Sequence, residues 1–408
     1  MARPSDGFPR MVADDSELEG LYRFFGCEEI EAEDVLAPHI EATFQRMREV
    51  DGPVLVLHDS TDFSFGGHEH RAGLGRMNGD QQGFIAHVAL AVVPGEERIP
   101  LGTCGLIRIS RTSSKIHRSG YEISQNPERE SLRWAQLATR IEQSGQGVSC
   151  IHVMDREADN YDLFATLQQA GARFVVRARH DRALVTDERL FPAIEALTPQ
   201  CFRNVEVSER RPRKRARETA TFRRPNWAHS EASELTVNLV RVWEPSPPEG
   251  EPAVSWLLYT SEPIKTRKQL LAIVDYYRSR WLIEELFKAL KTGCSIEKRQ
   301  LETYRALAVA LAVFLPVAWR LLLLRAASRK SPELAAKTIV TDVQLKLLRH
   351  KLNLKELPKT VGDAALAIAK LGGHLKRNGP PGWQTLGRGL ESLLLMEAGW
   401  RAAVASKL

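Results

Sequence analysis

A polar run between Tyr276 and Lys291 contains the side chains whose types and spacing most clearly suggest chemistry. Tyr277 and Arg280 lie seven and four positions before Glu284, and Lys288 and Lys291 lie four and seven positions after it. At about 100° per residue, all five fall within about 80° of arc on one helix face. A carboxylate among three cations and a phenol could hold a metal ion while the cations bind phosphates. The alternative is a solvated amphipathic helix with glutamate–lysine pairs.

Two aspartates add acidic side chains at the ends of apolar, strand-forming runs. Asp59 closes the run 53–59, and Asp155 closes the run 149–155. Parallel neighbouring strands bring their carboxyl ends to one edge of a sheet, where sites form. Together with Glu284, the two aspartates would supply three hard oxygen donors, the ligand type that Mg²⁺ and Mn²⁺ prefer. Two such ions can support phosphodiester cleavage and transfer.

Simpler roles stay open for these aspartates. Asp155 could cap the helix expected to begin near residue 158, and Asp159 could replace it as a ligand. Asp62 is the corresponding alternative to Asp59. The histidines at 68 and 70 have no matching distal ligands, which argues against a zinc site. Because no glycine-rich phosphate loop with the required spacing is present, we expect no nucleotide cofactor.

The elements that must position these side chains follow a mixed α/β order. Helical patterns cover 16–25 and 32–50, and Pro38 is expected to break the second helix near its start. After them we expect a strand over 53–59, a hairpin over 83–108 and a helix over 128–143. A strand over 149–155, a helix over 160–170 and a strand over 172–179 follow. This order predicts a mixed sheet with helices packed against it.

A basic segment interrupts this pattern. Residues 203–224 are rich in arginine and lysine, and strand-forming runs follow at 235–243 and 254–260. We interpret 181–260 as a β-rich insertion whose basic loop either contacts nucleic acid or forms a solvated hairpin tip. Residues 331–408 are helical in pattern.

The composition favours an anionic partner and a reducing compartment. The formal net charge is +6 over 408 residues, and the five cysteines show no metal-ligand or disulfide spacing. The apolar run 306–324 is interpreted as a buried core helix, so no membrane association is expected. We expect a cytoplasmic protein.

The same residues resemble a known family. The spacing of Tyr277, Arg280, Glu284 and Lys291 is similar to the Tyr-Arg-Glu-Lys signature of bacterial cut-and-paste DDE transposases of the insertion sequence four group. The blocks Asp59-Ser60-Thr61 and Asp155-Arg156-Glu157-Ala158-Asp159 resemble the strand ends of that family. Residues 256–263 and 371–373 are also similar to segments of that family.

The resemblance implies a ribonuclease-H-like mixed-sheet core with a β-rich insertion and helical N- and C-terminal regions. The implied divisions are a helical DNA-binding region over 1–50 and the first part of the core over 51–180. The insertion covers 181–260, the second part of the core with the Glu-bearing helix covers 261–330, and a helical dimerisation region covers 331–408.

The resemblance also implies roles for individual residues. Asp59, Asp155 and Glu284 would be catalytic and bind Mg²⁺, for which Mn²⁺ can substitute. Trp256 would stack on a base pulled from the duplex. Other side chains would contact DNA: Tyr277, Arg280, Lys288, Lys291, Arg156, Arg177, Arg179 and the cluster 210–217.

The activity implied is cleavage and strand transfer at insertion-sequence ends by a cut-and-paste route, through a hairpin intermediate, by a homodimer on double-stranded DNA. Residues 1–15 look unrelated to the helices with which the family begins. An N-terminally shortened, non-cleaving inhibitor of transposition that binds DNA or dimerises is therefore the alternative function. A structure-selective nuclease is a third hypothesis.

Overall fold

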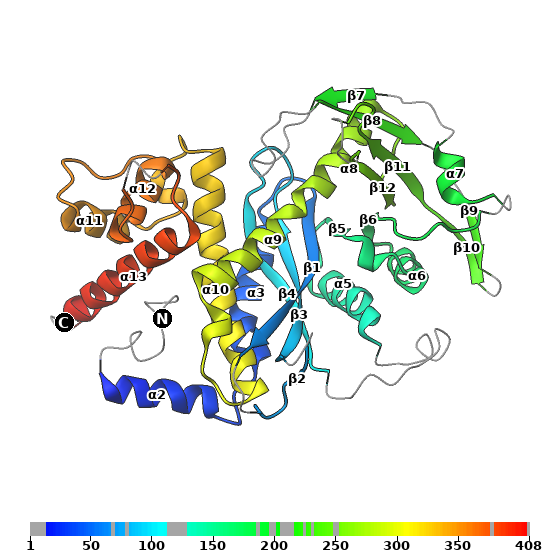
Figure 1. Cartoon of the computed structure of the whole chain (residues 1–408). Helices are drawn as coiled ribbons and strands as arrows, with labels where there is room; N and C mark the ends of the chain where they lie inside the picture. Colours follow the sequence, from blue (N-terminus) through cyan, green and yellow to red (C-terminus); the bar gives the residue numbers. More distant parts are fainter. Residues whose placement is uncertain are drawn as a thin grey trace. The chain divides into compact units, whose positions relative to one another are not determined.

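The structure is a computed structural model, and it describes the following residues: 14–66, 70–77, 81–111, 129–184, 188–195, 201–204, 216–222, 226–229, 232–247, 253–375 and 379–405. It divides into two compact units. Their helices and strands are labelled in Figure 1. Unit 1 comprises Met1–Val50, Ser60–Glu122 and Leu282–Leu408, and unit 2 comprises Asp51–Asp59 and Ile123–Trp281. One strand, β1 (Val54–Phe65), contributes its first half to unit 2 and its second half to unit 1.

Unit 2 contains a mixed sheet. Its strands are, in spatial order, the first half of β1, β5 (Cys150–Met154), β6 (Arg173–Arg177), β12 (Ser255–Thr260), β11 (Asn238–Trp243), β8 (Ala216–Phe222) and β7 (Cys201–Asn204). The first three strands are parallel, and each later neighbour is antiparallel. The predicted mixed α/β architecture is therefore confirmed.

Helices cover this sheet because their apolar faces need a partner. A buried cluster joins residues of α5 (Arg133–Ser144) and α6 (Tyr161–Gln169) to the alternate β6 residues Phe174 and Val176. The intervening residues of β6 point to the other face, as expected for a strand. On that face Arg173 donates to Glu262 at 2.8 Å, and α8 (Arg267–Ser279) packs against β5, β6 and β11.

The segment between β6 and β12 is rich in strands, as expected for 181–260. It adds α7 (Leu190–Glu195), β7, β8, a hairpin of β9 (Asn226–His229) with β10 (Ala232–Thr236), and β11. The predicted strand over 235–243 is divided between β10 and β11. Residues 210–215, most of the basic cluster, lie outside the described residues.

Unit 1 is built around a hairpin and a long helix. β3 (Gln82–Val92) and β4 (Pro100–Ile109) pair antiparallel as predicted, and β2 (Gly75–Arg76) pairs with β3. α3 (Ala32–Arg48) and α10 (Tyr304–Lys330) pack against β4. The other helices of this unit are α2 (Asp15–Gly26), α9 (Trp281–Lys288), α11 (Asp342–Lys351), α12 (Val361–Leu371) and α13 (Trp383–Ala405).

Pro38 does not break α3, contrary to expectation. The helix runs unbroken from Ala32 to Arg48 with Pro38 inside it. A proline in a helix interior removes one backbone hydrogen bond and costs about 3 kcal/mol. Burial of Leu36, Phe44 and Met47 offsets this cost, because each buried apolar side chain contributes about 1.5–3 kcal/mol.

The helix α10 contains the apolar run that raised the question of a membrane span. Among the described residues, it alone is long and apolar enough to cross a bilayer, yet 67% of its most apolar window is buried inside the protein. Pro316 lies within the helix, and Thr303 caps its start by accepting from the amide of Ala306. The burial agrees with the interpretation of a core helix.

Candidate active site

Asp59 and Asp155 lie at matching positions of two adjacent parallel strands. The register pairs Leu57 of β1 with Val153 of β5. Each aspartate lies two residues beyond these paired positions, so both carboxylates belong to the same edge of the unit 2 sheet. Both residues are half-buried. The predicted placement of the two aspartates on adjacent parallel strands is present in the structure, but the strand predicted to end at Asp59 continues to Phe65 because its second half belongs to unit 1.

Each of the two carboxylates has a donor that orients it. Nη1 of Arg280 donates to Oδ2 of Asp59 at 2.8 Å, and both side chains are only about one-sixth exposed, at 15% and 16%. Oδ1 of Asp155 accepts from the amide of Glu157 at 2.8 Å and caps the short 3-10 helix Arg156–Ala158. The helix expected to begin near residue 158 instead begins at Tyr161 and is capped by Asn160, so Asp155 caps only the 3-10 turn, which leaves Oδ2 for another role.

A buried chain of hydrogen bonds lies just inside this edge. Nε2 of His58 and Nδ1 of His152 are 2.8 Å apart, and Nε2 of His152 is 2.9 Å from Oε1 of Glu142. Both imidazoles are fully buried, and the chain ties β1 to β5 and to helix α5. It holds the strands in register beside the two aspartates. In the structure His58 therefore links the two strands that carry the aspartates.

The donor chemistry of the edge fits a hard divalent cation. Two carboxylates on adjacent strands are the oxygen ligands that Mg²⁺ and Mn²⁺ take. Within the part of the chain that the structure describes, no group of three histidine, cysteine, aspartate or glutamate side chains is arranged to hold a metal. The two aspartates are therefore candidate ligands, and the metal-binding triad with Glu284 stays a prediction.

Glu284 lies on α9, one helical turn beyond Arg280. Arg280 joins α8 to α9 in helical geometry. Glu284 is half-buried, and Ile283 and Leu286 on the same helix are fully buried. Asp59 and Asp155 belong to unit 2, whereas Glu284 belongs to unit 1, and its role as third ligand remains a prediction.

The helix bearing Glu284 is less regular than its spacing suggested. A π-helical turn at Ala289–Gly293 follows α9, so the 100° spacing does not extend to Lys291. Nζ of Lys291 donates to the carbonyl of Asp62 at 2.6 Å. Nζ of Lys288 pairs with Oε1 of Glu285 at 2.6 Å. The structure therefore ties both lysines to neighbouring groups of unit 1, and their contact with phosphate stays a prediction.

Tyr277 is buried and does not lie on an exposed polar stripe. Only 5% of it is exposed, and its ring lies edge-on to Trp256 with centroids 5.2 Å apart. Burial raises the pKa of the Tyr277 phenol, while the cations of Arg280 and Arg177 act against that rise. In this structure Tyr277 and Trp256 pack on each other, and their predicted DNA contacts remain untested.

Asp159 and Asp62 were the alternatives to the two strand-end aspartates. Asp159 is 4% exposed, and its carboxylate accepts from the amides of Arg179 and His180 at 2.6 and 2.8 Å and from Nη2 of Arg182 at 2.5 Å. Asp159 is fully engaged in holding a loop, which favours Asp155 as the ligand. Asp62 is exposed, and His68 lies outside the described residues.

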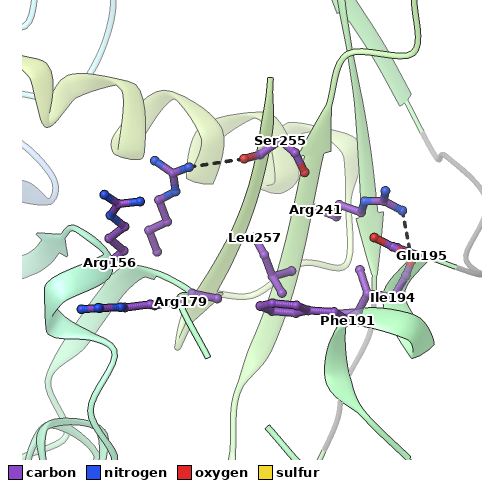
Figure 2. Close-up of a pocket in the computed structure, with 10 residues that line it drawn as sticks. Arg156, Arg179, Phe191, Ile194, Glu195, Arg241, Ser255 and Leu257 are labelled. Atoms are coloured by element: carbon purple, nitrogen blue, oxygen red, sulfur yellow. Dashed lines mark hydrogen bonds between the residues drawn. The ribbon is translucent and has the colours of Figure 1, made fainter. Parts of the chain in front are cut away.

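The predicted DNA-contact residues Arg156, Arg177 and Arg179 line one pocket of unit 2 (Figure 2). The pocket also contains Arg241 and Phe191, which the sequence reasoning missed. Arg241 could have been noticed as a lone cation inside the apolar run of β11. No comparable signal marks Phe191, because α7 is a single short helix within the insertion.

Comparison with known proteins indicates a class of enzyme to which this chain is similar. The model of a family described as "Transposase DDE domain" matches residues 120–315, a range that includes Asp155 and Glu284 but not Asp59. One solved structure similar to the chain is the cryo-EM structure of a piggyBac transposase synaptic complex with hairpin DNA, at 11% identity and a TM-score of 0.33. That similarity covers 88% of this chain and 69% of the other. An identity of 11% and a TM-score of 0.33 are too low to support a conclusion about this chain. The match to the transposase domain supports a DDE transposase.

Proposed function

We propose that this protein is a DNA transposase that cleaves and joins phosphodiester bonds through Asp59, Asp155 and Glu284. The observation that carries the proposal is the register of β1 and β5, which brings two hard carboxylate donors to one sheet edge. The match of residues 120–315 to a transposase domain supports the same activity. Glu284 is the third acidic ligand that the Glu-bearing helix supplies.

In the proposed mechanism the protein positions its ligands before the reaction begins. Arg280 fixes the carboxylate of Asp59, and the amide of Glu157 fixes that of Asp155. Bound Mg²⁺ or Mn²⁺ would supply charge stabilisation and an activated oxygen nucleophile for phosphoryl transfer. The buried pair His58 and His152 keeps the two strands aligned, so that the ligand spacing is preserved.

The finer features of the proposal follow the family resemblance. They are a ribonuclease-H-like core, a cut-and-paste route with a hairpin intermediate, a homodimer on transposon-end and target DNA, and a cytoplasmic location. The division into 1–50, 51–180, 181–260, 261–330 and 331–408 belongs to the same proposal. The proposed phosphate contacts come from Arg280, Lys288 and Lys291 of the Glu-bearing segment and from Arg156, Arg177 and Arg179 in unit 2.

The test is a cleavage assay with the purified full chain, Mn²⁺ or Mg²⁺, and DNA carrying the inverted repeats that flank its coding sequence. Hairpin and strand-transfer products are expected. Substitution of Asp155→Asn or Glu284→Gln should lower their rate on the order of 10³-fold, because a metal-ion contribution of several kcal/mol is lost.

Glu157→Gln is the matched control for Asp155→Asn. It lies in the same loop, and its side chain is 55% exposed and pairs with Arg133, which is 10% exposed. It should retain activity. Cleavage of the repeats that is unaffected by Asp155→Asn and Glu284→Gln would refute the proposal. Nicking of any DNA without strand transfer would instead indicate a nuclease built on the same carboxylates.

A further inference from the structure

The excess positive charge of the chain is concentrated in its C-terminal helices. Residues 331–408 contain twelve lysines and arginines against six aspartates and glutamates, so their formal charge of +6 equals that of the whole chain. The residues before them are therefore balanced in charge. The helices of this region are α11, α12 and α13, and α11 packs against both of the others (Figure 1). A local excess of this size attracts anionic partners.

Four of the six acids in this region are buried or paired. Glu391 and Glu397 of α13 are buried. Asp342 forms an ion pair with Lys337 at 2.8 Å, and Glu356 pairs with the lysine three residues after it. These carboxylates are therefore occupied within the region and do not balance its other exposed cations.

The remaining charge gathers on α11 and the turn that follows it. Residues 343–355 contain no aspartate or glutamate. Besides a histidine, they contain four exposed cations: Lys346, Arg349, Lys351 and Lys355. None of the four forms an ion pair with a residue that the structure describes. These four side chains are called the α11 basic surface below.

The packing of α11 turns part of this surface toward solvent. The buried face of the helix contains Gln344 and Leu348, and Nε2 of Gln344 donates to Oε2 of Glu397 on α13 at 2.6 Å. At about 100° per residue, Lys346 and Arg349 lie on the side of the helix opposite to that face. The backbone that carries these cations is thus fixed before any partner binds, which reduces the entropy lost on binding.

Helix stability accounts for only part of this charge. Cations in the last turn of a helix interact favourably with its macrodipole. Arg349 and Lys351 lie in the last turn of α11, but Lys346 precedes that turn and Lys355 follows the helix. The α11 basic surface therefore extends beyond the positions at which the helix itself favours a cation.

A polyanion fits this surface better than a second copy of the chain. In a two-fold symmetric dimer one patch meets the same patch of the partner, which would bring these cations against one another. Like charges that face each other across an interface are costly. Each strand of duplex DNA instead carries one phosphate per roughly 3.4 Å of helix axis. Lys346 and Lys351 are separated by about 7.5 Å along α11, which is long enough to reach successive phosphates.

We propose that the α11 basic surface binds the phosphate backbone of double-stranded DNA, and this inference rests on the proposed function. Lysine and arginine side chains neutralise phosphates and release their counterions. Contacts of this kind strengthen binding without selecting a sequence. The C-terminal helices would hold a duplex in addition to the contacts proposed for the Glu-bearing segment and for unit 2.

The binding experiment uses the full chain without divalent cations, so that cleavage plays no part. The probe is a fluorescently labelled blunt duplex of arbitrary sequence, and anisotropy gives its association constant at several salt concentrations. Lys346→Gln/Arg349→Gln should reduce the slope of log K against the logarithm of the salt concentration by about 2, because two phosphate contacts are lost at about 0.9 each. At about 0.1 M salt the affinity should fall roughly 10- to 100-fold.

Lys265→Gln/Lys268→Gln is the matched control, because it also removes two exposed cations. These lysines follow β12, which runs antiparallel to β6, so they leave the unit 2 sheet at the edge opposite to Asp155. Their loss should change the affinity less than about twofold through screened electrostatics. Lys346→Arg/Arg349→Lys keeps the charge of the surface and should bind as the wild type does. Thermal unfolding checks that each double variant is folded.

An equal salt slope in the wild type and in Lys346→Gln/Arg349→Gln would overturn the proposal. An equal loss of affinity in that variant and in the control would also overturn it, since the effect would then follow net charge alone. Poly-glutamate is the second probe. A loss of affinity for poly-glutamate as large as that for the duplex would overturn the assignment to DNA and indicate an acidic protein instead.

Two further arms identify the source of the duplex, because transposon ends and target DNA share the same phosphate chemistry. In the cleavage assay with Mn²⁺, loss of strand transfer with cleavage retained would assign the surface to target DNA, and loss of both would assign it to the ends. The binding result is separate from that assay. A salt slope that depends on α11 in a chain that cleaves no DNA would contradict only the transposase proposal. Intact cleavage with a salt slope that does not depend on α11 would contradict only this inference.

Discussion

The strand edge with Asp59 and Asp155 and the loop clamp around Asp159 use the same residue types for opposite purposes. At the edge, each aspartate is half-buried, with Arg280 oriented toward Asp59 and a single amide toward Asp155. In the clamp, Asp159 is almost fully buried, and two amides and the guanidinium of Arg182 occupy its carboxylate. Asp155 of the edge and Asp159 of the clamp are only four residues apart along the chain.

The difference shows how a short acidic block divides its work. A carboxylate that keeps one oxygen accessible can take a metal ion, because cation binding needs lone pairs that no protein donor occupies. A carboxylate that is saturated by buried donors contributes to stability and to the shape of the loop instead. The arginines of the pocket depend on that second role, since the clamp positions the backbone of Arg179.

The largest effect on stability is expected for Asp159→Asn. The substitution removes the charge that faces Arg182, whose side chain is 18% exposed, and it places an amide against backbone N–H donors. Breaking one side of a buried ion pair costs about 3–5 kcal/mol, so we expect a loss of about 3 kcal/mol in the free energy of unfolding. Denaturant unfolding measures it.

Asp155→Asn is the matched control for Asp159→Asn. The amide side chain keeps an oxygen to accept from the amide of Glu157, so its effect on the free energy of unfolding should be below about 1 kcal/mol. Equal destabilisation by the two variants would remove the distinction between edge and clamp.

An intermediate effect is expected for Arg280→Gln. Its pair with Asp59 is largely but not fully buried, so the carboxylate would lose its cationic partner at a cost of about 1–2 kcal/mol. A divalent cation that binds Asp59 would replace that lost charge. The melting temperature of Arg280→Gln should therefore rise with Mg²⁺ more than that of the wild type. An equal response to Mg²⁺ in both proteins would argue against a cation at Asp59.

Much of the fold could be predicted because its signals are local. The apolar runs ending at Asp59 and Asp155 are strands, and the intervening helix α5 makes them parallel, which fixes their shared edge. The pairing of β6 with β12 could not be predicted in this way, since these strands are separated by the whole insertion. Pairing at that distance depends on tertiary packing, which leaves no periodic trace in the sequence.

The sequence predicted the adjacent-strand placement of Asp59 and Asp155 better than the surroundings of the aromatic residues. Tyr277 matches a polar stripe by spacing, but its burial depends on Trp256, which a distant strand provides. The π turn after α9 likewise follows from how the segment packs, because Gly293 lies against Leu321 of α10. Regular helical spacing is a local rule, and it fails where a tertiary contact sets the backbone.

The smallest effect is expected for Glu157→Gln, within the same acidic block as Asp155 and Asp159. Oε2 of Glu157 accepts from Nη2 of Arg133 at 2.9 Å, but the glutamate side chain is 55% exposed. Exposed ion pairs contribute about 0–1 kcal/mol because water and salt screen them. We expect a loss below about 0.5 kcal/mol that disappears at high salt, in contrast to Asp159→Asn. Unfolding measured at two salt concentrations checks this. A loss above 2 kcal/mol would mean that the whole block acts as one structural unit, and that its three carboxylates do not have separate roles.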